Sequence, residues 1–295
     1  MSDFRLSCGD YEAKIRKSGA GLDSLTFKGR NLIEPFELNQ PERYRGDVLA
    51  PWPNRIRDGK YVFEGTKFQL ELTEPSRSNA LHGLVNRIPW SPEYLDTKKV
   101  KLSYELNKPQ YYPATLNFQI QYEICVSGLL IELEVKNVGK ISGPLGVSIH
   151  PYLIADSDSR VDEWVLKMPS SRYFRVDEQR LLPLEIATTP SNLDFRNFQK
   201  IGNSFIDHAF EIDAAIADQE IRVLAPSGNG VGMSYSKNLT WIQIHTADRD
   251  GGVDSRRCLA VEPMSCPPDA FNSGLNLVKI APNQLEKWSW KIFAL

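Results

Sequence analysis

Residues 116–138 read "LNFQIQYEICVSGLLIELEVKNV", and this stretch decides the class of fold. Every second residue from 116 to 126 is apolar, and most of the residues between them are polar. The alternation resumes at 131–136. A period of two is typical of a β-strand with one buried face. The short Ser127-Gly128 link between the two halves therefore predicts an antiparallel hairpin.

The same alternation recurs in short segments along the chain. Further strands are predicted at 60–64, 67–72, 100–106, 220–226, 240–246 and 287–295. The 19 glycines and 19 prolines interrupt the rest, and short helical turns are expected near 190–197 and 268–272. Many strands joined by turns predict an all-β fold, a large antiparallel β-sandwich with few short helices. We expect a single domain over residues 1–295.

The composition restricts the class of protein. Of the 295 residues 41% are hydrophobic and 24% are charged, with a formal net charge of -2 at pH 7. No excess of basic residues is present, so we expect no nucleic-acid partner. The first residues lack the pattern of a signal peptide, and no apolar run reaches the roughly 18–20 residues that span a membrane. The sequence therefore predicts a cytoplasmic protein with no membrane partner.

The four cysteines do not form a recognisable metal or redox motif. Cys8, Cys125, Cys258 and Cys266 contain no CxxC pair, which fits a reducing compartment. Cys258 and Cys266 lack a nearby histidine spacing that would complete the ligands of a zinc site. We expect neither a metal nor a cofactor.

Two loops carry candidate binding residues. In "PWPNRIR", Asn54 and Arg55 lie between a proline-stiffened segment and a predicted strand. The guanidinium of Arg55 offers a planar fork of hydrogen-bond donors. In "ALHGL", His82 stands before Gly83 in a tight loop. Taken singly, Arg55 also fits an exposed surface turn, and His82 also fits a structural histidine.

Two strand ends carry candidate acid–base residues. In "SIHPYL", Pro151 restricts His150 to an extended backbone at the end of a predicted strand. In "AVEPM", Glu262 follows two apolar residues, and burial raises the pKa of a carboxyl toward the range of a general base. His150 also fits a structural role at a strand edge. Glu262 also fits a structural ion pair with Arg256 or Arg257.

The stretch "FIDHAFEI" adds Asp207 and His208. Neighbouring residues of a strand point to opposite faces, so at most one of the two faces a given cleft. Aromatic side chains can cover the apolar face of a sugar ring, although each fits a core position equally well. The candidates are Trp52, Tyr152, Trp241 and Phe271.

With these residues assembled, the sequence resembles the aldose 1-epimerase (galactose mutarotase) family. The resemblance rests on five motifs that occur here in the family's order: "NRIRDGKYVFEG", "LHG", "HPY", "IDHAF" and "VEPMSCPPDAFNSG". Each motif is short, but five in order are specific. The family's fold, the galactose mutarotase-like supersandwich, is a large antiparallel β-sandwich and agrees with the period-two pattern.

The resemblance implies an aldose 1-epimerase, which interconverts the α and β anomers of a hexose or related aldose. Glu262 would be the general base that takes the proton of the anomeric hydroxyl, and His150 the general acid that protonates the ring oxygen. Nearby carboxylates such as Asp207 are expected to raise the pKa of His150. The implied substrate-binding residues are Asn54, Arg55, His82, Tyr152, Asp207 and Trp241.

Other functions stay open. The stretch "NALHGLVNR" lacks a doubled glycine, so the chain looks closer to the shorter bacterial members than to the galactose enzymes. Further arginines either indicate a hexose-6-phosphate 1-epimerase or are ordinary surface charge: Arg57, Arg77, Arg87, Arg256 and Arg257. A non-catalytic carbohydrate-binding module and a glycosidase that pairs Glu262 with Asp207 are the remaining alternatives. The pattern predicts neither the preferred sugar nor the oligomeric state.

Overall fold

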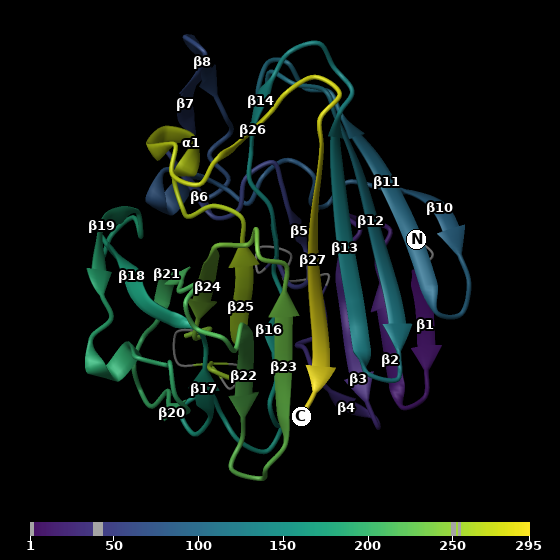
Figure 1. Ribbon diagram of the computed structural model, residues 1–295, viewed down its shortest axis with the longest axis vertical. Coiled ribbons are helices and arrows are strands. Elements are labelled where there is room, and N and C mark those ends of the chain that lie inside the picture. The colour runs from purple at the N-terminus through teal and green to yellow at the C-terminus, as the bar shows by residue number, and fades with distance from the viewer. Residues whose placement is uncertain (1–2, 38–43, 249–251, 253–254) are drawn as a thin grey trace.

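The predicted hairpin forms the centre of the largest sheet. The computed structural model describes residues 3–37, 44–248, 252 and 255–295, and Figure 1 traces the chain. In it, β12 (Leu116–Cys125) and β13 (Gly128–Asn137) pair antiparallel along their whole length. The hairpin prediction is confirmed.

We call the sheet around this hairpin the large sheet. Its described strands run in the order β10 (Ser91–Leu95), β11 (Lys99–Leu106), β12, β13, β27 (Leu285–Ala294), β23 (Gly230–Tyr235), β22 (Glu220–Leu224), β17 (Val165–Lys167) and β20 (Gln199–Lys200). All neighbouring strands pair antiparallel. β27 lies between β13 and β23, so it joins the two halves of the sheet (Figure 1).

Two further sheets form the second layer. The N-terminal sheet consists of β1 (Phe4–Cys8), β2 (Tyr11–Ile15), β3 (Leu22–Phe27) and β4 (Arg30–Asn31) in sequence order. The cleft sheet runs in the order β16 (Tyr152–Leu153), β25 (Leu259–Met264), β24 (Trp241–His245), β21 (Asp207–Ile212), β18 (Ser170–Val176) and β19 (Pro183–Thr188). Both are antiparallel.

Short strand pairs and helical turns complete the described fold. The pairs are β5 (Val48–Leu49) with β15 (Ser148–Ile149), β6 (Arg55–Arg57) with β9 (Asn79–Leu81), β7 (Lys60–Phe63) with β8 (Thr66–Gln69), and β14 (Gly143–Leu145) with β26 (Val278–Ile280). The helical turns are the 3-10 turns η2 (Pro75–Arg77) and η3 (Ser191–Leu193) and the single α-helical turn α1 (Ala270–Ser273).

The two layers enclose the core and are joined by hydrogen bonds. The alternate residues Leu116, Phe118, Ile120, Tyr122 and Ile124 of β12 are all buried, as the period of two predicts. Burial of each such side chain contributes roughly 1.5–3 kcal/mol. The Tyr122 hydroxyl donates to the Ala20 carbonyl (2.7 Å), and the Trp290 indole N–H donates to the Pro263 carbonyl (3.0 Å). The large sheet is thus joined to both sheets of the second layer.

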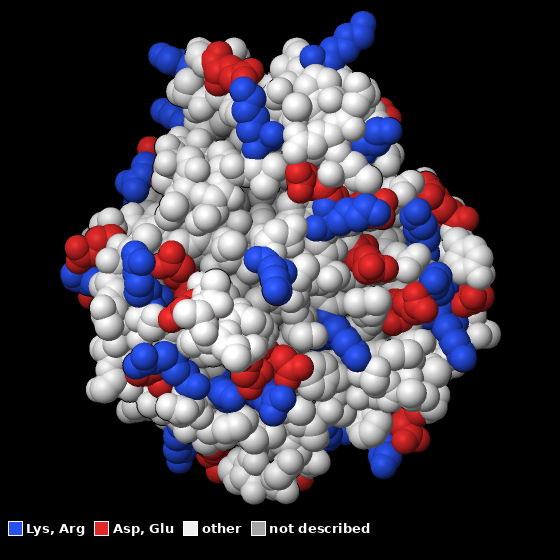
Figure 2. Space-filling model, in the orientation of Figure 1, with Lys and Arg blue, Asp and Glu red and all other residues white. Residues whose placement is uncertain are grey.

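The fold prediction is confirmed as an all-β antiparallel sandwich. The predicted strands at 60–64, 100–106, 220–226, 240–246 and 287–295 appear as β7, β11, β22, β24 and β27. The predicted strand at 67–72 is shorter, because β8 ends at Gln69. The short helices η3 and α1 lie where turns were expected. Basic and acidic side chains are interspersed on the face shown in Figure 2. In the described ranges, the helices are all too short to cross a membrane.

Candidate active site

A cavity of about 300 Å³ lies over one face of the cleft sheet and collects most of the predicted site residues. Its volume is at the lower end of the range for small-molecule sites. The predicted residues that line it are Asn54, Arg55, His82, His150, Tyr152, Asp207 and Glu262. Residues separated by about 200 positions in the sequence therefore share one cleft, although their roles remain predictions.

Strand register arranges the floor of the cleft. Glu262 of β25 lies opposite Gln243 of β24, and two positions further along the register Ala260 lies opposite His245. His245 in turn lies opposite Asp207 of β21. Directly opposite residues of antiparallel strands point to the same face. The floor therefore carries two rows of side chains, one with Glu262 and Gln243 and the other with Ala260, His245 and Asp207.

One wall is formed by two loops in strained backbone conformation. Asn54 and His82 have φ of 55° and 61°, in the left-handed region. The Asn54 N–H donates to Nδ1 of His82 (3.2 Å), and the His82 N–H donates to the Asn54 carbonyl (2.9 Å). At Gly83 a Cβ would lie 2.0 Å from the Ala50 carbonyl oxygen, so the loop "LHG" requires its glycine. Burial lowers the pKa of His82 well below its usual range, and because Nδ1 of the neutral ring accepts from Asn54, Nε2 carries the proton.

His150 and Glu262 meet in the cleft. Nε2 of His150 lies 3.4 Å from Oε1 of Glu262, and their side chains are 6% and 2% exposed. His150 follows directly after β15, at the strand end that the sequence predicts. The backbone N–H of His150 donates to the Asp47 carbonyl (3.0 Å), and the backbone carbonyl of His150 accepts from the Gly46 N–H (2.8 Å). Backbone contacts on both sides thus fix the imidazole beside the carboxyl group.

Arg55 organises the charges at the other side of the cleft. Its Nε and Nη2 donate to the two carboxylate oxygens of Glu74 (2.8 and 3.0 Å), and Nη2 lies 3.6 Å from Oδ2 of Asp207. Gln243 Nε2 donates to Oδ1 of Asp207 (2.6 Å). Burial alone would raise the pKa of Asp207, but the charge of Arg55, together with that of His245 and the hydrogen bond from Gln243, outweighs burial and lowers the pKa. Asp207 is therefore an ionised acceptor.

The proton of the His150–Glu262 pair lies on the carboxyl group in the free protein. Burial, followed by the charge of Asp207, raises the pKa of Glu262 well above its usual range. Burial, followed by the charge of His245, lowers the pKa of His150 to about 3. The prediction that carboxylates raise the pKa of His150 is wrong, because burial outweighs the attraction of Asp207. The 3.4 Å contact therefore joins two neutral groups.

Several polar atoms of the cleft lack a protein partner. Among the described residues, five buried atoms of cleft-lining side chains make no hydrogen bond: Arg77 Nε, His150 Nδ1, Gln243 Oε1, His245 Nδ1 and Glu262 Oε2. Buried polar groups are nearly always hydrogen-bonded, and leaving one unpaired costs about 1–3 kcal/mol. Such a cluster indicates a site that a polar ligand completes.

Trp241 is the exception among the predicted site residues. It is fully buried, stacks on Phe174 with ring centroids 5.0 Å apart, and donates its indole N–H to Asn276 Oδ1 (2.9 Å). The prediction that it covers a sugar ring is wrong, because Phe174 and Asn276 cover it instead. Trp52 and Phe271 also lie outside the lining and pack edge-to-face on one another at 5.6 Å.

Two alternatives from the sequence are also decided by the structure. Asp207 lines the cleft, whereas His208 lies against Tyr173 at 5.5 Å, so only one of the adjacent pair serves the cleft, as predicted. Arg256 pairs with Asp162 and Asp248 rather than with Glu262.

The structure adds cleft residues that the sequence analysis missed. They include Tyr44, Glu74, Gln243 and His245. Gln243 and His245 alternate with the apolar Ile242 and Ile244 along β24 and pair with the strands of two recognised motifs, so alternation combined with pairing could have identified them. Glu74 immediately precedes the 3-10 turn η2, and no local pattern marks it. In the described part of the chain, no group of three or more His, Cys, Asp or Glu side chains is arranged to hold a metal ion.

Comparisons with known proteins agree with this architecture. A sequence model of the aldose 1-epimerase family matches residues 3–292. The Escherichia coli K12 protein YihR is 34% identical over 290 residues, which cover 98% of this chain and 92% of YihR. Galactose mutarotase from Sus scrofa is 21% identical over 286 residues, 89% of this chain and 82% of that protein.

Solved structures show the same fold. The GalM/aldose epimerase homologue from C. elegans superposes with a TM-score of 0.86 at 18% identity, covering 100% of this chain and 98% of the other. Galactose 1-epimerase from Lactobacillus acidophilus superposes with a TM-score of 0.78 at 19% identity, covering 97% and 91%.

Proposed function

The chain belongs to the aldose 1-epimerase family, and from that premise we propose that it interconverts the α and β anomers of a hexose or related aldose. The observation that carries the proposal is the buried His150–Glu262 contact at 3.4 Å, in a cleft whose polar atoms are incompletely paired. Ring opening needs one proton removed from the anomeric hydroxyl and one delivered to the ring oxygen. An adjacent acid and base supply both transfers. Residues 1–295 act as one domain around this cleft.

Binding of the sugar prepares the pair for the reaction. In the free protein Glu262 holds the proton and His150 is neutral, as the directions of their pKa shifts require. A hydroxyl that donates to Oε2 of Glu262 stabilises the carboxylate, because a hydrogen bond to the charged form favours it. The proton then moves to Nε2 of His150 across the 3.4 Å contact. The pair carries one proton in both arrangements, so its net charge does not change.

The reaction then proceeds by two proton transfers. The Glu262 carboxylate takes the proton of the anomeric hydroxyl while the His150 imidazolium protonates the ring oxygen, so the C1–O5 bond breaks and a free aldehyde forms. Rotation about the C1–C2 bond presents the other face of the carbonyl. On closure, Nε2 of His150 takes the proton back from the O5 hydroxyl as that oxygen attacks C1, and the Glu262 carboxyl returns its proton to the carbonyl oxygen. The two groups thus exchange their tasks, and the opposite anomer leaves.

The remaining polar groups suit a ligand rich in hydroxyl groups. Asp207 and the unpaired Gln243 Oε1 are acceptors, and His82 Nε2 is a donor. The donors of Arg55 are directed to the carboxylates of Glu74 and Asp207. Acceptors thus outnumber uncommitted donors, which favours the O–H groups of a sugar. Tyr152 stacks on His150 at 4.9 Å and helps to fix its ring.

Anomer exchange measured by saturation-transfer NMR or polarimetry over a panel of aldoses tests the proposal. We expect at least one aldose to equilibrate faster with the protein than in buffer. Acceleration of none would overturn the mutarotase proposal. Sugar binding without any rate effect, unchanged by Glu262→Gln, would identify a carbohydrate-binding module instead. Release of an aglycone from a model glycoside would identify a glycosidase.

One observation favours an aldose with an anionic substituent as a second candidate. Arg77 lines the cleft, and its buried Nε has no partner among the described residues. Its Nη1 already donates to Glu74 Oε1 (3.1 Å), so part of its charge is matched. Arg57, Arg87, Arg256 and Arg257 are not among the lining residues. Exchange rates for free and 6-phosphorylated hexoses, measured side by side, decide between the two substrates. Faster exchange of the phosphorylated sugar, lost in Arg77→Gln, would favour the second.

A further inference from the structure

His245 lies at the centre of the floor of the cleft. The proposed acid–base reaction gives this residue no role. It lies in β24 between Ala260 of β25 and Asp207 of β21, opposite both in register. Tyr152 lies opposite Ala260 on the far side of β25. The small side chain of Ala260 therefore lets the rings of Tyr152 and His245 approach edge-to-face across it, with centroids 6.5 Å apart.

The polar chemistry of His245 is incomplete. Its Nδ1 is buried and has no hydrogen-bond partner among the described residues, and the side chain lines the cleft. Its neighbour Asp207 is already engaged, since it accepts from Gln243 and lies 3.6 Å from Arg55 Nη2. A buried imidazole nitrogen without a partner, on a side chain that lines a cavity, indicates a missing ligand atom.

His245 also lies at a useful distance from the reacting pair. Gln243, two residues earlier in β24, lies opposite Glu262. Two residues of a strand span about 6.6 Å. A sugar ring whose anomeric carbon lies beside Glu262 would therefore extend toward His245, and one of its other substituents would reach the imidazole.

We propose that His245 is a substrate-binding residue, whose Nδ1 forms a hydrogen bond with one sugar hydroxyl remote from the anomeric carbon and thereby selects the aldose. The inference rests on the proposed mutarotase function. It assigns His245 to selectivity, and it leaves proton transfer to His150 and Glu262. The matched comparison within the chain is His208, which lies next to Asp207 on the opposite face of β21 and outside the cleft lining.

Monodeoxy sugars provide the test. For the aldose that the wild type accelerates most, kcat/KM is measured by NMR exchange with the parent sugar and with each of its monodeoxy analogues. The same panel is then measured with His245→Phe, which removes Nδ1 and retains a ring. We expect the wild type to discriminate against one remote deoxy analogue by about tenfold, the factor that corresponds to one hydrogen bond. His245→Phe should have a kcat/KM about tenfold lower than the wild type for the parent sugar. For that analogue, the variant and the wild type should have the same kcat/KM.

Two polar variants separate hydrogen bonding from packing. His245→Asn places an amide near the position of Nδ1, whereas His245→Gln places it near Nε2. Compared with His245→Phe, we expect His245→Asn to regain more of the discrimination against the deoxy analogue than His245→Gln does. We expect His208→Gln to retain the wild-type selectivity. If His245→Phe does not fold, the Asn and Gln variants carry the same test.

The outcomes distinguish the two proposals. Losses at position 245 that are the same for every analogue would overturn the role of His245, because a merely structural residue affects all sugars equally. A wild type that accelerates no aldose would overturn the mutarotase function itself.

Discussion

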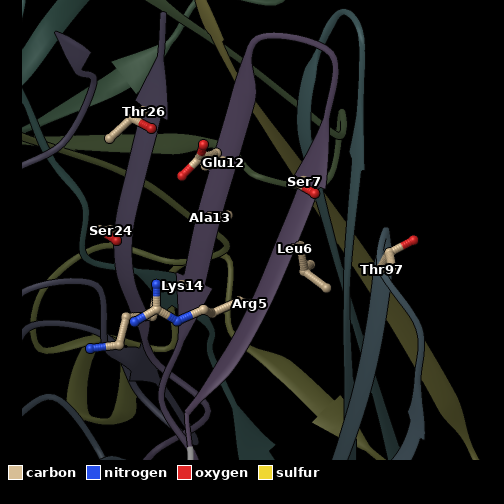
Figure 3. A pocket seen from close by; sticks show the side chains of 9 residues that line it. All are labelled: Arg5, Leu6, Ser7, Glu12, Ala13, Lys14, Ser24, Thr26 and Thr97. Carbon is tan, nitrogen blue, oxygen red and sulfur yellow. The ribbon is translucent and has the colours of Figure 1, made fainter. Parts of the chain in front are cut away.

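The groove over the N-terminal sheet and the cleft over β24 and β25 have similar volumes, about 340 and about 300 Å³, but their polar groups differ. Figure 3 shows the groove, which runs along β1–β3 between Arg5, Glu12, Lys14 and Thr26. Lys14 lies 3.1 Å from both Asp3 and Asp23 and is partly exposed. In the described residues, the groove lining contributes no buried polar atom without a partner, whereas the cleft contributes several.

The unpaired buried polar atoms distinguish the cleft, as a candidate binding site, from the groove. Solvent and neighbouring charges satisfy the polar groups of the groove, so nothing in it requires a ligand. The cleft holds buried groups with shifted pKa values and unpaired atoms, which is a combination typical of functional sites.

The largest effect is expected from Glu262→Gln. The amide fills the same volume but cannot accept the anomeric proton, so kcat for mutarotation should fall by about 10²–10⁴-fold. Polarimetric kinetics measure the loss, and circular dichroism of both proteins checks that the fold is kept. A folded variant with wild-type kcat would remove Glu262 from its role as base.

His150→Asn should cost about 10²-fold or more in kcat, since it removes the group that we propose delivers the proton to the ring oxygen. The backbone contacts of His150 with Gly46 and Asp47 do not involve the side chain and should persist. Kinetics with a saturating sugar concentration separate this effect from weaker binding. An unchanged kcat accompanied by a raised KM would assign His150 to binding alone.

A third prediction concerns stability and pH. The pKa of Glu262 is raised in the folded protein, so the folded state holds a proton that the unfolded chain releases above its ordinary value of 4.5. The Glu262 contribution to stability is therefore present below that value and is lost as the pH rises toward the folded-state pKa. The unfolding free energy of Glu262→Gln, relative to wild type, should increase with pH by about 1.4 kcal/mol per unit.

Urea unfolding of the wild type and Glu262→Gln at pH 5, 6 and 7 measures this difference directly. The shift of His150 acts in the opposite direction, because its lowered pKa makes stability fall as the pH drops from about 6.5 toward 3. His150 is present in both proteins, so its contribution largely cancels in the comparison. A difference that does not change with pH would show that Glu262 titrates normally.

The smallest effect is expected in the groove. Lys14→Ala removes partly exposed ion pairs, which usually contribute about 0–1 kcal/mol each. Mutarotation should keep its wild-type kcat and KM, and stability should change by less than about 1 kcal/mol. A marked loss of mutarotation in Lys14→Ala would show that the groove, like the cleft, contributes to activity.

The fold was predictable from the sequence where a single strand shows apolar–polar alternation along its own length. The alternation at 116–126 identifies a strand and its buried face without reference to any other segment. The site was predictable only where a motif marks it, as at His150 and Glu262. Trp241 shares a strand face with Gln243 and His245. It lies two residues before Gln243 in β24, where Phe174 and Asn276 cover it.

The electrostatics of the site depend on the three-dimensional structure. The sequence shows carboxylates that could attract a proton to His150, but not the degree of burial that opposes this. Burial lowers the pKa of His150 to about 3, and no local pattern conveys it. In the same way, Glu74 reaches Arg55 only through the pairing of β6 with β9.

The position of β27 determines when the two halves of the large sheet can join during synthesis. Residues 285–294 lie near the end of this sequence but pair with both β13 and β23. Until the ribosome has released them, both of those strands present free edges, which are prone to pair with other chains. Trp290 of β27 also supports Pro263, next to Glu262. A nascent chain therefore supports the floor of the cleft and pairs the edges of β13 and β23 with the same segment.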